Sequence, residues 1–151
     1  MPEPGPKVVV DASVVVKWMV REEDRDRALM LREAHLRGEV SLCAPDLLLY
    51  EVCNALRFCP DFTGEDVEAA AGALLGLSLR LSPPTLHTLG GAAKEAYKHG
   101  VTVYDAVYLS LAGVEGAHLV TADKDFHGKL AGDPRVCLLS SEKFLDIFEH
   151  E

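Results

Sequence analysis

The chain has 151 residues, of which 48% are apolar and 26% are charged, a balance typical of one globular domain. No apolar run approaches the ~20 residues that a bilayer span requires. Residues 1–6 lack the basic and apolar regions of a secretory signal, so we expect a cytoplasmic protein without a membrane anchor. The formal net charge of −9 argues against a broad basic face for nucleic acid, so any RNA contact would need bound metal or local basic groups.

The first elements are a strand and two helices. The apolar run Lys7–Val10 predicts a strand buried on both faces, and this strand ends at Asp11. A helical segment follows over residues 12–20. Residues 24–37 are rich in helix formers and predict a second helix, which ends at Gly38 because glycine suits the C-terminal cap.

The middle of the chain predicts another strand and two more helices. Residues 41–44 form a short apolar strand, and Pro45 suits the first turn of a helix that runs to about Phe58. Thr63 and Asp66 have the spacing of a capping box, which predicts the start of an alanine- and leucine-rich helix.

The last third of the chain alternates between helices and strands after the helix-breaking pair at residues 83–84. We expect helices over residues 86–98, 104–114 and 123–130, strands over residues 117–121 and 136–139, and a terminal helix capped by Ser140. Strands separated by helices imply a mainly parallel sheet, because parallel neighbours need crossover connections. We therefore predict a single α/β domain with three α/β/α layers over residues 7–151, preceded by a disordered extension over residues 1–6.

Four acidic residues lie where a charge is costly to bury. Asp11 and Asp123 each follow an expected strand, at the sheet edge where α/β proteins form their sites. Glu51 and Asp105 each interrupt an otherwise apolar segment, and burial there requires a partner or a metal ion. No lysine or arginine in these segments could neutralise all four. A divalent cation could, because Mg²⁺ and Mn²⁺ prefer oxygen ligands, and such a site can activate water against a phosphodiester.

Each acid also has a structural interpretation. Asp11 and Asp123 precede helices and could serve as N-caps. Thr102 and Asp105 have the spacing of a capping box, and Glu51 could face solvent from its helix. Spacing alone does not show that the four carboxylates meet in space.

Four segments resemble the PIN domain of VapC-type toxins. These are residues 8–13 (VVVDAS), 50–56 (YEVCNAL), 103–112 (VYDAVYLSLA) and 119–123 (LVTAD). The resemblance extends from residue 8 to about residue 148. In that family the corresponding acids cluster at one end of a parallel sheet and bind Mg²⁺ or Mn²⁺. The resemblance implies the same role for Asp11, Glu51, Asp105 and Asp123, and it implies a metal-dependent endoribonuclease, the toxin of a toxin–antitoxin pair.

The resemblance also suggests supporting residues. Ser13 stands where the family often has a hydroxyl near the metal, and Thr121 precedes the last acid by two residues. Asn54 would share a helix face with Glu51, three residues earlier. A local cap or an exposed polar position explains each of the three equally. Asp125 is a reserve candidate, which a favourable charge in the first turn of a helix explains as well.

The family further implies protein partners. VapC-type proteins form homodimers and are held inactive by an antitoxin that covers a groove near the active site, so we expect an RNA substrate, an antitoxin and a homodimer. Trp18, Met19, Tyr50 and Phe58 could line such a groove, but we interpret them as ordinary core residues. The negative net charge is compatible with a basic partner segment.

Three other functions stay open. A PIN nuclease could act in RNA processing outside toxin systems. A phosphatase or phosphoacceptor domain would use Asp11 as its nucleophile, but those families want a further acid where Ala12 and Ser13 stand. A non-catalytic binding module could keep the fold, although its intact carboxylates argue against this interpretation.

Overall fold

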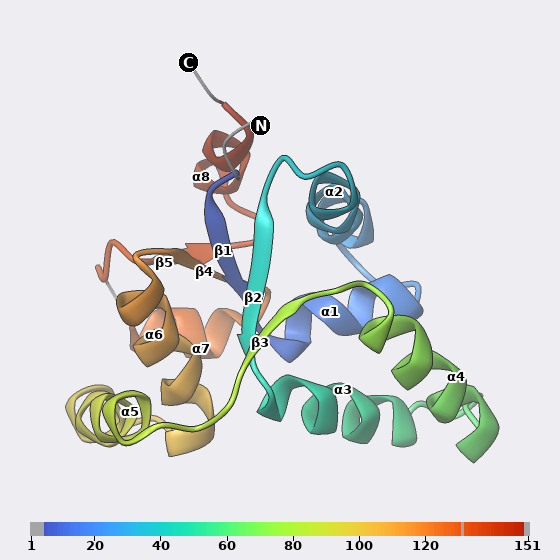
Figure 1. Cartoon of the computed structure of the whole chain (residues 1–151), viewed down its shortest axis with the longest axis horizontal. Coiled ribbons are helices and arrows are strands. Elements are labelled where there is room, and N and C mark those ends of the chain that lie inside the picture. Colours follow the sequence, from blue (N-terminus) through green and yellow to red (C-terminus); the bar gives the residue numbers. More distant parts are fainter. Residues whose placement is uncertain (1–4, 131, 150–151) are drawn as a thin grey trace.

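The computed structural model describes residues 5–130 and 132–149 (Figure 1). The first half of the chain contains β1 (Lys7–Val10), α1 (Ala12–Met19), α2 (Arg25–Leu36), β2 (Ser41–Pro45), α3 (Leu47–Arg57) and α4 (Gly64–Leu75). The second half contains β3 (Arg80–Ser82), α5 (Leu86–His99), α6 (Val103–Glu115), β4 (His118–Thr121), α7 (Lys124–Lys129), β5 (Val136–Leu138), α8 (Glu142–Leu145) and a short 3₁₀ helix, η1 (Asp146–Phe148).

The five strands form one parallel sheet in the order β3-β2-β1-β4-β5. The chain builds the sheet outward from β1, first to β2 and β3 on one side and then to β4 and β5 on the other. Strands β1 and β4 are therefore neighbours, with Val10 paired to Val120. The α/β class and the parallel sheet are confirmed.

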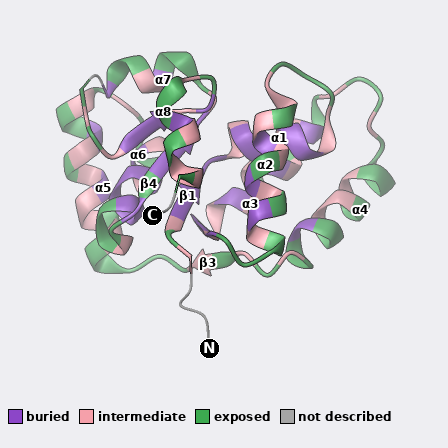
Figure 2. Ribbon diagram, turned by 90° about the horizontal axis from the view of Figure 1, so that it is seen from above, coloured by how far each residue is buried: buried purple, intermediate pink, exposed green. Residues whose placement is uncertain are grey.

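Helices cover both faces of the sheet, as the three-layer prediction requires (Figure 1). On one face α6 packs on β1, β2 and β4, and α5 packs on α6. On the other face α1 packs on β4, while α2 and α3 contact β2 and α4 extends outward from α3. Purple ribbon in Figure 2 marks buried residues, which follow the strands and the facing sides of α1, α3 and α6.

The core is aliphatic and centres on the sheet. Val9, Val10, Leu42, Leu119 and Val120 are fully buried, because both faces of a parallel strand are covered by helices. In the described part of the chain, no helix is long and apolar enough to cross a membrane.

Several local predictions hold. The Thr63–Asp66 capping box forms with both of its hydrogen bonds and begins α4. Gly38 and Gly100 have positive φ angles of 75° and 66°, the left-handed conformation that ends α2 and α5. Residues 1–4 of the expected N-terminal extension lie outside the described residues, whereas the carbonyl of Pro6 accepts a hydrogen bond from Ser41.

Three local predictions are wrong. Pro45 is the last residue of β2 rather than the first turn of α3, and a proline at a strand end removes little of the ladder. Strand β3 was not expected, because its three half-exposed or exposed residues produce no apolar run. The residue before α8 is Ser141, not Ser140, and its side chain makes no capping hydrogen bond.

Candidate metal-binding active site

The site begins where β1 and β4 end side by side. Connections from these two strands run to opposite faces of the sheet, so the crevice beyond their carboxyl ends is a topological switch point. Because Val10 pairs with Val120, the next residues, Asp11 and Thr121, lie opposite one another. The parallel register thus brings together two residues that are 110 positions apart in the chain.

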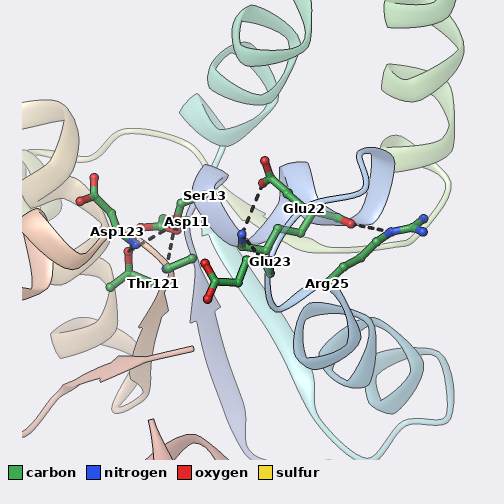
Figure 3. Close-up of polar contacts among 9 residues, drawn as sticks. Asp11, Ser13, Glu22, Glu23, Arg25, Thr121 and Asp123 are labelled. Atoms are coloured by element: carbon green, nitrogen blue, oxygen red, sulfur yellow. Dashed lines mark hydrogen bonds and ion pairs between the residues drawn. The ribbon is translucent and has the colours of Figure 1, made fainter. Parts of the chain in front are cut away.

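The Asp11 carboxylate is held by two hydroxyl groups (Figure 3). Ser13 Oγ donates to Asp11 Oδ1 and Thr121 Oγ1 donates to Asp11 Oδ2, both at 2.5 Å. Each hydroxyl also accepts a backbone hydrogen bond, Ser13 from Ala122 at 2.9 Å and Thr121 from Asp123 at 3.1 Å. The roles expected for Ser13 and Thr121 near the site therefore have a geometric basis.

Burial dominates the electrostatics of Asp11. This residue is 8% exposed, and desolvation raises the pKa of its carboxyl group from 3.8 to about 6. The hydrogen bonds from Ser13 and Thr121 act in the opposite direction, while the negative charge of Asp123 adds to the rise. Asp11 precedes α1 and lacks a capping hydrogen bond, although the backbone N–H of Val14 in the first turn of α1 lowers its pKa.

Glu51 is fixed by a tyrosine from the opposite layer. Tyr108 of α6 is almost fully buried, and its hydroxyl donates to Glu51 Oε1 of α3 at 2.5 Å. Desolvation raises the pKa of Glu51, this bond opposes the rise, and the charge of Asp105 adds to it. The hydroxyl of Tyr108 is in turn held protonated, because burial and the bond to Glu51 raise its pKa. Glu51 therefore points inward rather than to solvent.

Asp105 and Asp123 complete the acidic group. Half of the expected capping box forms between the described residues Thr102 and Asp105, since Thr102 Oγ1 accepts from the Asp105 backbone at 3.1 Å without the reciprocal backbone bond. Desolvation and the charge of Asp123 raise the pKa of Asp105, while Lys129 lowers it. Asp123 does cap α7, because its Oδ1 accepts from the backbone of Phe126 at 3.0 Å.

The four acids form a connected chain of repulsive neighbours. The negative charge of Asp123 raises the pKa of both Asp11 and Asp105, and the charge of Asp105 raises the pKa of Glu51. All donor atoms are carboxylate oxygens, a set suited to a hard divalent cation. As the side chains lie, no three of the described His, Cys, Asp or Glu residues are close enough to hold a metal ion. The chemistry of these donor atoms fits a divalent cation.

Two of the other predicted residues lie at the edge of this group. Asn54 is exposed one turn of α3 after Glu51, and Asp125 is exposed in the first turn of α7. Tyr108 was not expected in the site. The spacing could have indicated it, because Tyr108 follows Asp105 by three residues, and residues at that spacing share one face of a helix.

Aromatic residues near the site differ from the expectation. Trp18 is core, as interpreted, with its Nε1 donating to the carbonyl of Ala28 at 2.8 Å. Tyr50 and Phe58 are not core, being 76% and 72% exposed. Tyr50 instead lines an apolar groove of about 260 Å³ with Tyr104 and residues of α5, α6 and the segment 82–84. Helix α3 turns only one of its faces inward, so apolar residues on the other face remain at the surface.

Known proteins share much of the sequence of this chain. The family model of the PIN domain matches residues 8–129, a range that contains every candidate site residue. Ribonuclease VapC3 of Pyrobaculum aerophilum is 34% identical over 129 residues, which cover 82% of this chain and 94% of that protein.

Solved structures share the fold. VapC20 of Mycobacterium tuberculosis, a sarcin-ricin loop cleaving toxin, has a TM-score of 0.65 at 19% identity, covering 85% of this chain and 98% of its own. A chain of a toxin–antitoxin complex from Klebsiella pneumoniae has a TM-score of 0.64 at 12% identity, covering 89% of this chain and 98% of its own.

Proposed function

This chain belongs to the PIN-domain family, and we propose that it is a metal-dependent endoribonuclease, the toxin of a toxin–antitoxin pair. Asp11, Glu51, Asp105 and Asp123 hold Mg²⁺ or Mn²⁺ in this proposal. The observation that supports it is that burial raises the pKa of Asp11, Glu51 and Asp105, with a further rise from the charge of a neighbouring acid, Asp123 for Asp11 and Asp105, and Asp105 for Glu51.

A bound divalent cation would lower the pKa of a water molecule and stabilise the negative charge that develops at the cleaved phosphodiester. The chain supplies the positions of the ligands. Ser13 and Thr121 hold both oxygens of Asp11, so this carboxylate cannot rotate without losing a hydrogen bond. The hydroxyl of Tyr108 holds one oxygen of Glu51, Oε1, by a hydrogen bond. Such outer hydrogen bonds orient the ligands and tune their basicity.

The choice of RNA as substrate rests on the relatives. The name of the Pyrobaculum protein gives it as a ribonuclease, and that of the Mycobacterium protein gives its target as the sarcin-ricin loop. For this chain the net charge of −9 leaves a bound metal ion and local basic groups as the sources of attraction for a phosphate. RNA affinity should therefore be higher with the metal than in EDTA.

A protein partner is also part of the proposal. One structural relative is in a toxin–antitoxin complex, and the apolar groove beside Tyr50 and Tyr104 exposes the kind of surface that protein interfaces cover. In this proposal the groove is the contact of the expected homodimer, and the relative supports the expected antitoxin. Light scattering of the wild type and of Tyr104→Glu tests the dimer, which the added charge should dissociate. The expected cytoplasmic location stays a prediction.

Cleavage of a panel of single-stranded and hairpin RNAs tests the activity. The reactions contain Mg²⁺, Mn²⁺ or EDTA, and an Asp105→Asn variant is purified and assayed beside the wild type. We expect cleavage that needs metal and is lost in the variant, because the amide that replaces the carboxylate carries no charge. Equal cleavage by the wild type and the variant, or cleavage in EDTA, would refute the proposed mechanism.

A further inference from the structure

A second hollow adjoins the carboxylates. It measures about 280 Å³ and lies between α1, α3 and the turn after β4. Ser13 and Ala122 form the wall that it shares with the acidic site, where Ala122 donates to the same Ser13 oxygen that contacts Asp11. Ala55 lines the opposite wall, one turn of α3 after Glu51. A group in this hollow would lie beside Ser13, which donates to the Asp11 carboxylate.

The only cationic side chain that lines the described part of this hollow is Lys17. Lys17 is 9% exposed and follows Ser13 by one turn of α1, so the two side chains share a helix face. Its Nζ donates to the carbonyl of Glu23 at 2.7 Å and lies 3.4 Å from Glu22 Oε1. An ammonium group has three N–H donors, and the described contacts use two of them. One donor remains for a ligand.

The contact with Glu22 is weak and can be replaced. The Glu22 side chain is 43% exposed, and ion pairs with so much solvent contribute little. A phosphate that entered the hollow would offer Lys17 a stronger, charge-assisted hydrogen bond than this distant carboxylate does. Ala12, Val16 and Ala55 supply small apolar walls on which a ribose or a base can lie.

We propose that this hollow binds the RNA nucleotide next to the scissile bond, with Lys17 holding that nucleotide's phosphate. The inference rests on the proposed nuclease function and extends it. Ser13 and Lys17 are separated by about 6 Å along the axis of α1, a length comparable to the spacing of successive phosphates. In a chain with a net charge of −9, a buried lysine at this place is the local basic group that an RNA would need.

The competing explanation is structural, since Lys17 also ties the α1–α2 turn to α1. The two explanations differ at Glu22. If Lys17 only holds the turn, Glu22→Gln has no effect on RNA. If Lys17 binds a phosphate, the Glu22 carboxylate competes with that phosphate, and its removal strengthens binding.

Binding is measured by fluorescence anisotropy with a labelled single-stranded RNA in EDTA, over a series of salt concentrations. We expect Lys17→Met to weaken binding roughly tenfold and to reduce the salt slope by about 0.7, the value for one lost phosphate contact on a single strand. Glu22→Gln should tighten binding about two- to fivefold, and this gain should disappear in the Lys17→Met background. Lys17→Arg keeps the charge and should keep the binding.

Lys143→Met is the control, because Lys143 lies at the start of β5, away from the strand ends that carry the site, where its Nζ donates to the carbonyl of Val136. We expect it to bind as the wild type does. The proposal is overturned if Lys17→Met and Lys143→Met bind alike, if Glu22→Gln has no effect, or if the wild type binds no RNA. Cleavage of the same RNA in Mg²⁺ is followed in parallel. Binding that depends on Lys17 without any cleavage would refute the nuclease and keep the subsite.

Discussion

Asp11→Asn should stabilise the protein when no metal is present. The Asp11 carboxyl has a pKa of about 6 in the folded chain against an ordinary value of 3.8. The folded state therefore favours the neutral form, and stability is lost as the pH rises from about 4 through about 6. Above that window the folded chain carries the full cost of a buried charge. Asparagine has nearly the same shape and never carries the charge.

The magnitude follows from the size of the pKa rise. A rise of about two pKa units corresponds to about 3 kcal/mol of destabilisation above pH 6. An amide has one oxygen where the carboxylate has two, so the variant loses about 1 kcal/mol from its hydrogen bonds with Ser13 and Thr121. We expect Asp11→Asn to be more stable than the wild type by about 2 kcal/mol at pH 7.5 and less stable by about 1 kcal/mol at pH 4.

Urea unfolding in EDTA at both pH values measures this difference. In thermal unfolding the gain at pH 7.5 should appear as a Tm higher by roughly 4–8 °C. Asp125→Asn is the control, because Asp125 is exposed in the first turn of α7, and its stability should stay near that of the wild type at both pH values. Saturating Mn²⁺ should reverse the order, since the ion stabilises only the chain that binds it.

A stability difference between wild type and Asp11→Asn that is the same at pH 4 and pH 7.5 would refute the reasoning. A less stable variant at pH 7.5 in EDTA would refute it as well. A difference that does not change with pH would mean that the hydroxyls of Ser13 and Thr121 offset the cost of burying the charge, and a less stable variant at pH 7.5 would mean that they outweigh it.

Substitutions at three other positions separate structure from function. Asp123→Ser should keep the cap of α7 and lose Mn²⁺ affinity, whereas Asp123→Ala should also lose about 1 kcal/mol of stability in EDTA, as urea unfolding and Mn²⁺ titration would show. Thr121→Val should raise the pKa of Asp11 further, so that proton-coupled Mn²⁺ binding in calorimetry shifts to higher pH, while Thr121→Ser should not. Tyr108→Phe should raise the Mn²⁺ concentration that half-maximal cleavage requires, because Glu51 loses the hydrogen bond that stabilises its charge.

The sequence predicted the fold well because its elements follow local rules. The buried strand of β1, the capping box of α4 and the glycine caps of α2 and α5 depend on residues close together in the chain. Strand β3 was missed for the opposite reason. It has three residues and forms only because it pairs with β2, a contact that no local pattern specifies.

The four acids of the proposed site could be singled out from the sequence, whereas the hydrogen bond between Tyr108 and Glu51 could not. Asp11 and Asp123 were placed by the rule that strand ends carry sites, and Glu51 and Asp105 by the cost of a charge in apolar sequence. The hydrogen bond between Tyr108 and Glu51 joins α6 to α3 through two residues that are 57 positions apart in the chain, and it forms only when the two helices pack together. Tertiary packing also decides which face of α3 is buried. For this reason the apolar residues Tyr50 and Phe58, which we interpreted as core from the sequence, lie at the surface.

Calorimetric titration of the protein with Mn²⁺ tests the metal site most directly, with the wild type compared to Asp105→Asn and Asp125→Asn at pH 7.5. Four converging carboxylates predict saturable binding by the wild type and by Asp125→Asn, and affinity for Asp105→Asn that is lower by roughly tenfold or more. The wild type should also bind more weakly as the pH falls below about 6, where Asp11 takes up a proton. Equal affinity in all three proteins, or no saturable binding by the wild type, would contradict a metal site at these residues.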